Sequence, residues 1–126
     1  MLSFEGRFCG SEMPIPDDVQ MLLPWKTLEG EDRRADLFST RLKDDLPSAH
    51  RLHGLRVRAV AARVDRDDVL FEVEGGAVSL AVVHMTWQKE TDSRWPTTKF
   101  FQSWEEWSRN EMLPSHQEYS VGSEEN

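Results

Sequence analysis

The sequence predicts an α+β domain, in which a three- to four-stranded antiparallel meander carries two packed helices. Three observations lead to this fold class. Residues 54–87 form three runs in which apolar and polar residues alternate, with turn-forming residues between the runs. Residues 31–46 carry apolar side chains at helical spacing. Ser103 and Glu106 match the capping box that begins a helix. We expect a single domain over residues 1–126.

Residues 1–24 are predicted to form a loosely ordered N-terminal arm. Phe4 and Phe8, among polar neighbours, indicate a short edge strand. A helical turn over residues 17–23, ended by Pro24, is expected next. We expect the arm to dock on the domain through its last apolar residues, which are Met21, Leu22, Leu23 and Trp25.

The first helix is predicted over residues 31–46. Apolar residues recur there at spacings of three and four, namely Ala35, Phe38, Leu42 and Leu46. Glu31 and Asp32 suit the positive end of the helix dipole, and Pro47 ends the helix. We expect this helix to lie on the apolar side of the sheet.

The last two strands of the meander are predicted to meet at Gly75-Gly76. Two glycines suit a two-residue type I′ turn, which would place Val69 opposite Val82 and Phe71 opposite Leu80. This register would gather the apolar residues of both strands on one face: Val69, Phe71, Val73, Val78, Leu80 and Val82.

The preceding turn is predicted to be a four-residue loop over the polar segment 65–68, which would pair Val64 with Val69. The alternation changes phase between Ala59 and Val60. We interpret the change as a β-bulge. The alternative is that both faces of the sheet are partly covered.

A short fourth strand is predicted over residues 97–101. The second helix then begins at Ser103, runs to about Met112 and is closed by Pro114. Residues 115–126 are predicted to form a tail that frays at its end.

Composition limits the classes of function. The chain has 23 acidic against 15 basic residues and a formal net charge of −8, so a nucleic-acid partner is not expected. An acidic surface favours either solubility or a basic protein partner. The sequence has no apolar run of about 18 residues, so no membrane span is expected. The start of the chain lacks a signal-peptide pattern, and the single Cys9 cannot form an internal disulfide. We therefore expect a cytoplasmic protein.

Motifs that carry chemistry are missing from the sequence. It contains no phosphate-binding glycine loop, cysteine pair, HExxH or GxSxG, so no catalytic residue, metal or cofactor is predicted. His50 and His53 lie between the first helix and the sheet, where we expect solvent-exposed side chains. His84 is predicted at the rim of the sheet. It is either a core-edge histidine bonded to a backbone group, or a general base or ligand contact.

Tryptophan is unusually frequent, with five residues in the chain, four of them within positions 87–107. The helical spacing of Trp104 and Trp107 favours a core role. Trp87 and Trp95 fit a core edge and a binding surface equally well. The predicted binding residues are His84, Trp87, Arg94, Trp95, Glu105 and Glu106.

The block from Ala81 to Tyr119 contains AVVHMTW, RWPTTKFFQSWEEW and MLPSHQEY. It resembles small acidic bacterial proteins of the immunity or antitoxin class, which neutralise a partner toxin. The resemblance implies a protein-binding role and assigns a function to no single residue.

The sequence therefore predicts a non-enzymatic protein-binding module, in its sharpest form an immunity- or antitoxin-like inhibitor of a basic partner protein. The alternative is a small-ligand-binding protein or an enzyme. Its pocket would lie between the sheet and the second helix, lined by His84, Trp87 and Trp95, with Arg94 as an anion contact. A homodimer formed through an exposed edge strand is a further alternative.

Overall fold

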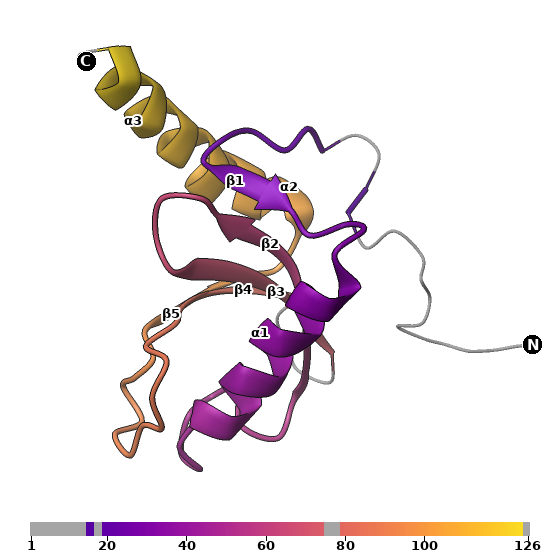
Figure 1. Cartoon of the computed structure of the whole chain (residues 1–126), viewed down its shortest axis with the longest axis vertical. Coiled ribbons are helices and arrows are strands. Elements are labelled where there is room, and N and C mark those ends of the chain that lie inside the picture. The colour runs from indigo at the N-terminus through magenta and orange to yellow at the C-terminus, as the bar shows by residue number, and fades with distance from the viewer. Residues whose placement is uncertain (1–14, 17–18, 75–78, 125–126) are drawn as a thin grey trace, which may run out of the picture.

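A computed structural model of the chain describes residues 15–16, 19–74 and 79–124 (Figure 1). Within them, five antiparallel strands form one sheet in sequence order: β1 (Trp25–Thr27), β2 (Arg56–Arg63), β3 (Asp68–Glu74), β4 (Leu80–His84) and β5 (Thr98–Phe101). The α+β class and the strand before the second helix are confirmed. The sheet exceeds the expected three to four strands because β1, at the end of the predicted arm, pairs with the end of β2.

Helix α1 (Asp32–Asp45) covers one face of the sheet, and its bounds match the predicted helix within one residue (Figure 1). Ala35, Phe38 and Leu42 are buried. They belong to one core cluster with residues of three strands: Val57, Ala59, Ala62, Val69, Phe71, Val73, Ala81 and Val83. The helical periodicity of the sequence therefore identified the buried side of α1 correctly.

The predicted register between β3 and β4 is wrong by one residue. Val69 lies opposite Val83, and Phe71 lies opposite Ala81. The shift places Leu80 and Val82 on the other face of the sheet, in a second core cluster. All four residues 80–83 are buried, so the apolar pattern of this strand is continuous and does not specify its register. The Gly75-Gly76 turn lies outside the described residues.

The hairpin between β2 and β3 is offset from its predicted pairing. Val69 pairs with Ala62, whereas the predicted partner, Val64, is 53% exposed. The bulge predicted near Ala59 and Val60 is confirmed, because the register shifts between Ala59 and Ala61. The extra residue changes which side chains face α1.

The C-terminal helix is longer than predicted. It begins as α2 (Trp104–Trp107), passes through a π-helical segment η2 (Ser108–Met112) and continues as α3 (Leu113–Glu124). The expected end at Pro114 is therefore wrong, and the predicted tail is helical as far as Glu124. Proline lacks an amide hydrogen and crowds the carbonyl four residues earlier. The wider π turn lies directly before Pro114, where it relieves this conflict.

The predicted N-terminal cap of this helix is confirmed, because Ser103 Oγ accepts a hydrogen bond from the amide of Glu106 at 3.0 Å. The carboxylate of Glu106 reaches back one residue further than expected and accepts from the amide of Gln102 at 3.0 Å. The first bond satisfies one of the amides that helix geometry leaves without a partner, and the second ties the preceding residue to the helix.

The second core cluster lies between the C-terminal helix and the sheet. Trp107 is fully buried, and its ring meets the ring of Trp25 edge to face at a centroid distance of 5.5 Å. The core role expected for Trp107 is confirmed. Other members of this cluster are Val60, Ala61, Leu70, Leu80, Val82, Phe101 and Met112.

The arm docks on this second cluster. Met21 and Leu22 pack against it as expected, but Leu23 is 48% exposed. Residues 19–22 form no helical turn, and the rest of that predicted turn is only partly described. The strand predicted around Phe4 and Phe8 lies outside the described residues.

Candidate functional site

Residues 85–97, here called the tryptophan loop, connect β4 to β5 and contain no helix or strand. The loop carries Trp87, Arg94 and Trp95, and His84 precedes it directly. Loops that reach about 12–15 residues without secondary structure are uncommon in compact domains and are usually either functional or linkers. The tryptophan loop is therefore the first candidate site.

Hydrogen bonds tie the tryptophan loop to α1 and to the segment that follows it. The guanidinium of Arg41 donates to the carbonyl of Trp87, and the amide of Glu90 donates to the carbonyl of Asp45 at 2.9 Å. At the far end, Nε2 of His50 donates to the carbonyl of Pro96 at 3.0 Å. The loop is thus held at its start, middle and end.

His50 corrects the expectation of an exposed side chain. It is buried, with 7% of its surface exposed. Its Nδ1 accepts from the amide of Leu52 at 3.1 Å, so Nε2 carries the hydrogen that Pro96 accepts. His53 is exposed, as expected. Sequence reasoning missed the role of His50 because its partner lies 46 residues away.

The two loop tryptophans lie at the surface. Trp87 is 40% and Trp95 is 43% exposed. The Trp87 ring packs against Phe38 of α1 at a centroid distance of 5.8 Å. Trp87 has φ of 60°, a left-handed conformation that residues with side chains rarely adopt and that costs about 1–3 kcal/mol. Such strained positions cluster at functional sites.

The remaining predicted site residues have local partners. His84 Nδ1 lies 2.7 Å from a carboxylate oxygen of Asp68 on the neighbouring strand. His84 is therefore bonded to a carboxylate where a backbone group had been expected. Arg94 pairs with Asp92 at 2.7 Å, and this hydrogen-bonded partner lowers the pKa of Asp92 to about 2.

Glu105 and Glu106 lie apart from the tryptophan loop. Both belong to α2, on the sheet face opposite α1. Glu105 pairs with Arg109 one turn later at 2.6 Å, while Glu106 caps the helix. The structure thus collects His84, Trp87, Arg94 and Trp95 along one loop but does not bring the two glutamates to it.

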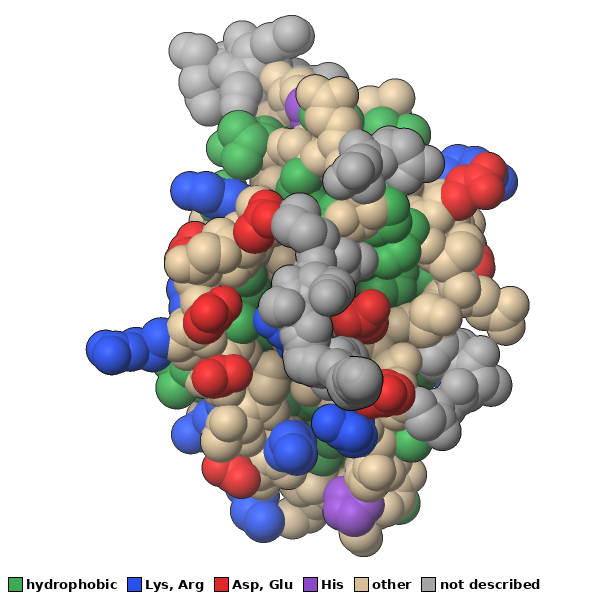
Figure 2. Space-filling model, turned by 90° about the vertical axis from the view of Figure 1, so that its right-hand side faces the viewer, with side chains coloured by type: hydrophobic (Ala, Val, Ile, Leu, Met, Phe, Trp, Pro, Cys, Tyr) green, Lys and Arg blue, Asp and Glu red, His purple; other side chains and the backbone are tan. Residues whose placement is uncertain are grey.

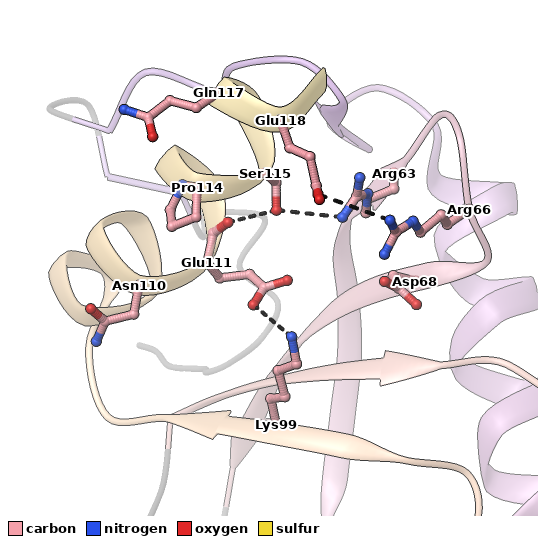
Figure 3. Close-up of a pocket in the computed structure, with 10 residues that line it drawn as sticks. All are labelled: Arg63, Arg66, Asp68, Lys99, Asn110, Glu111, Pro114, Ser115, Gln117 and Glu118. Atoms are coloured by element: carbon pink, nitrogen blue, oxygen red, sulfur yellow. Dashed lines mark hydrogen bonds and ion pairs between the residues drawn. The ribbon is translucent and has the colours of Figure 1, made fainter. Parts of the chain in front are cut away.

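A second candidate site is a cavity of about 600 Å³ between the sheet and the C-terminal helix, here called the polar cavity (Figure 3). Its lining residues are Arg63, Arg66, Asp68, Lys99, Asn110, Glu111, Pro114, Ser115, Gln117 and Glu118. A pocket had been expected in this region, but with His84, Trp87 and Trp95 in its wall. These three do not line the polar cavity. Six of its ten lining residues lie beyond Ser108, in the π-helical segment and in α3.

Arg63 is the buried cation of the polar cavity, with a side chain 4% exposed. Its Nε and Nη2 each donate to the Asp65 carboxylate at 2.9 Å, and Nη1 lies 3.4 Å from Ser115 Oγ. Burial acts to lower the pKa of Arg63, but the hydrogen bond and charge of Asp65 outweigh it and the pKa is raised. The same hydrogen bond lowers the pKa of Asp65.

Glu111 is the buried acid of the polar cavity, with a side chain 8% exposed. It belongs to the π-helical segment and accepts a hydrogen bond from Lys99 Nζ at 3.1 Å. The Lys99 side chain is itself 67% exposed. The backbone carbonyl of Glu111 accepts from Ser115 Oγ at 2.6 Å, which ties the segment to the next helical turn.

Comparisons with known proteins gave no match: no family model, curated protein or solved structure resembles the chain closely enough to be counted. Among the described residues, no group of three or more His, Cys, Asp or Glu side chains is placed to hold a metal ion. The described helices include none that is long and apolar enough to span a membrane.

Proposed function

We propose that this chain is a non-enzymatic protein-binding module that recognises a basic partner protein through the tryptophan loop. One observation carries the proposal. Trp87 and Trp95 are 40% and 43% exposed on a long loop that the domain holds at several points. Exposed indoles provide large, rigid contact areas, and tryptophan is enriched among the residues that dominate binding energy.

The anchored loop also lowers the entropic cost of binding. Ordering a side chain or a loop at an interface costs about 0.5–1.5 kcal/mol for each rotamer-rich side chain. Arg41 and His50 already hold the two ends of the loop in the free protein. A partner would therefore meet a surface that is largely preformed.

The charge of the chain supports a basic partner. The formal net charge is −8, and an acidic protein accelerates its encounter with a basic one. On the side of the molecule shown in Figure 2, acidic and basic side chains are interspersed. We therefore expect electrostatics to affect the association rate, and the aromatic contacts to determine the lifetime of the complex. The most specific version of this proposal is that the chain inhibits a toxin-like partner.

The test is affinity purification of partners from the native host, with the wild-type chain and two variants as baits. The double variant Trp87→Ala/Trp95→Ala removes the exposed indoles. Leu37→Ala is the matched control, because Leu37 is 62% exposed on α1 and lies outside the loop.

We expect a basic protein to be retained by the wild type and by Leu37→Ala. Loss of one dominant contact costs about 2 kcal/mol or more, so the double variant should bind it at least about 30-fold more weakly. Equal retention by all three baits would contradict the proposal.

A second function, binding of a small ligand, is favoured by the polar cavity. Its volume of about 600 Å³ falls within the range of roughly 300–1,000 Å³ that is typical of ligand pockets. Buried polar side chains converge on it from the sheet and the C-terminal helix (Figure 3). This function does not depend on the tryptophan loop.

A further inference from the structure

We infer that the polar cavity binds a cationic group, an ammonium or guanidinium, which takes the place of Lys99 on the carboxylate of Glu111. The inference names the ligand class for the small-ligand function above and rests on that function. It follows from how burial is distributed between the positive and negative side chains of the cavity.

Arg63, the buried cation of the cavity, is already paired with Asp65. Both carboxylate oxygens of Asp65 accept from Arg63, each at 2.9 Å, and this bidentate pair comes from a single strand end and its turn. Two parallel charge-assisted bonds are among the strongest polar contacts in proteins. Arg63 therefore has little capacity left to attract an anionic ligand.

Glu111 is held differently, because this acid is buried while its cation is exposed. Glu111 is 8% exposed and its partner Lys99 is 67% exposed. Of the other acids of the cavity, Asp68 is 14% exposed and Glu118 is 73% exposed. Lys99 makes its hydrogen bond to Glu111 from a largely exposed side chain, so a cation that arrives from solvent can compete with it.

The cost of leaving Glu111 without a cation determines which ligand fits. A buried carboxylate that loses its partner is strongly destabilising, so Lys99 cannot simply leave. A ligand with its own ammonium or guanidinium can displace Lys99 and keep Glu111 paired. An anion in the place of Lys99 would leave the buried Glu111 carboxylate without a cation and facing a second negative charge.

The other features of the cavity suit the same ligand class. Arg66 and Glu118 face each other across the cavity at 4.0 Å, a loose pair that leaves the Glu118 carboxylate available (Figure 3). Asn110 and Gln117 add amide oxygens that accept N–H donors. Glu111 is presented by a π-helical turn, a distortion that occurs frequently at functional sites.

The test is a titration of the ¹⁵N-labelled full chain followed by amide chemical shifts. The cationic probe is agmatine, which carries one guanidinium and one ammonium group. Inorganic phosphate is the anionic probe and urea is the neutral one. We expect saturable shifts for agmatine at amides around Lys99, Glu111 and Ser115.

Two substitutions should change the agmatine affinity in opposite directions. Glu111→Gln removes the buried acceptor charge and should weaken binding about tenfold or more. Lys99→Gln removes the internal competitor and should strengthen binding several-fold. Glu105→Gln and Lys89→Gln make the same changes in net charge outside the cavity, and neither should alter the affinity.

Several results would overturn the inference. One is an unchanged agmatine affinity in folded Glu111→Gln, and another is a parallel change in the Glu105→Gln control. If Glu111→Gln does not fold, Asp68→Asn takes its place with the same expected weakening. If phosphate gives saturable shifts and agmatine gives none, the cavity is a ligand site, but its ligand is an anion and the inferred cationic class is wrong. No saturable shift with any probe would overturn both the class and the small-ligand function.

Discussion

Nε2 of His50 donates a hydrogen bond to the carbonyl of Pro96 at 3.0 Å and so joins the segment after α1 to the end of the tryptophan loop. The two residues are 46 positions apart in the chain. His50 is buried, and Pro96 is among the fully buried side chains. The bond therefore connects the loop to the interior of the domain.

His50→Ala should destabilise the protein. The substitution leaves the amide of Leu52 without its buried acceptor, and such a group costs about 1–3 kcal/mol, while the carbonyl of Pro96 keeps the hydrogen bond from Thr98 Oγ1 at 3.0 Å. Urea unfolding would measure the loss. The control is His53→Ala, which should change the free energy of unfolding by less than about 0.5 kcal/mol because His53 is exposed. Similar losses in both variants would contradict the assignment.

Arg41→Gln should loosen the start of the tryptophan loop. Arg41 donates to the carbonyl of Trp87 and also pairs with Asp45 at 2.9 Å. Without these bonds, we expect faster hydrogen exchange at the amides of residues 86–90 and weaker partner binding. Arg34→Gln is a suitable control because Arg34 pairs with Glu31 at the other end of α1. Unchanged exchange rates in Arg41→Gln would show that the loop is held by other contacts.

Ser103→Ala should weaken the start of the C-terminal helix. Loss of the N-cap hydrogen bond to Glu106 costs about 1 kcal/mol, within a usual range of roughly 0.5–2. Thermal or urea unfolding would detect the change. Ser103→Asp should restore most of the stability, since aspartate also caps helices. If Ser103→Ala is as stable as the wild type, this cap does not contribute to stability.

Asp65 should stabilise the protein only above acidic pH. Its pKa is lowered below the ordinary value of 3.8, first by the hydrogen bond from Arg63. Stability from a depressed carboxyl pKa is fully present above the unfolded value and is lost as the pH falls through the folded value. Wild type should thus exceed Asp65→Asn in stability at pH 7, and the difference should shrink below about pH 3.8. A difference that does not change with pH would contradict this coupling.

Glu72 should behave in the opposite way. Its pKa is raised above 4.5, mainly by burial, while nearby Arg58 opposes the shift. A raised carboxyl pKa favours the folded state only while the group is protonated, so the cost appears as the pH rises through and above 4.5. Glu72→Gln should therefore be more stable than the wild type at pH 7, with little difference near pH 3. Unfolding curves at the two pH values would test the sign.

Features that depend on residues close in the chain were predictable. Helix α1 follows from the spacing of Ala35, Phe38 and Leu42, and the cap at Ser103 follows from the residue three positions later. The bulge near Ala59 also came from a local break in alternation. Each of these signals is complete within a few residues, which is why single-sequence reasoning recovered it.

Tertiary structure alone decided the strand register, the path beyond Pro114, the polar cavity and the contacts that hold the tryptophan loop. Residues 80–83 are buried on both faces, so no polar residue marks which neighbour each should meet. The π-helical turn that carries the chain past Pro114 positions Glu111 beside Lys99, and His50 holds Pro96. These contacts join segments far apart in sequence, and packing of the whole sheet determines their positions.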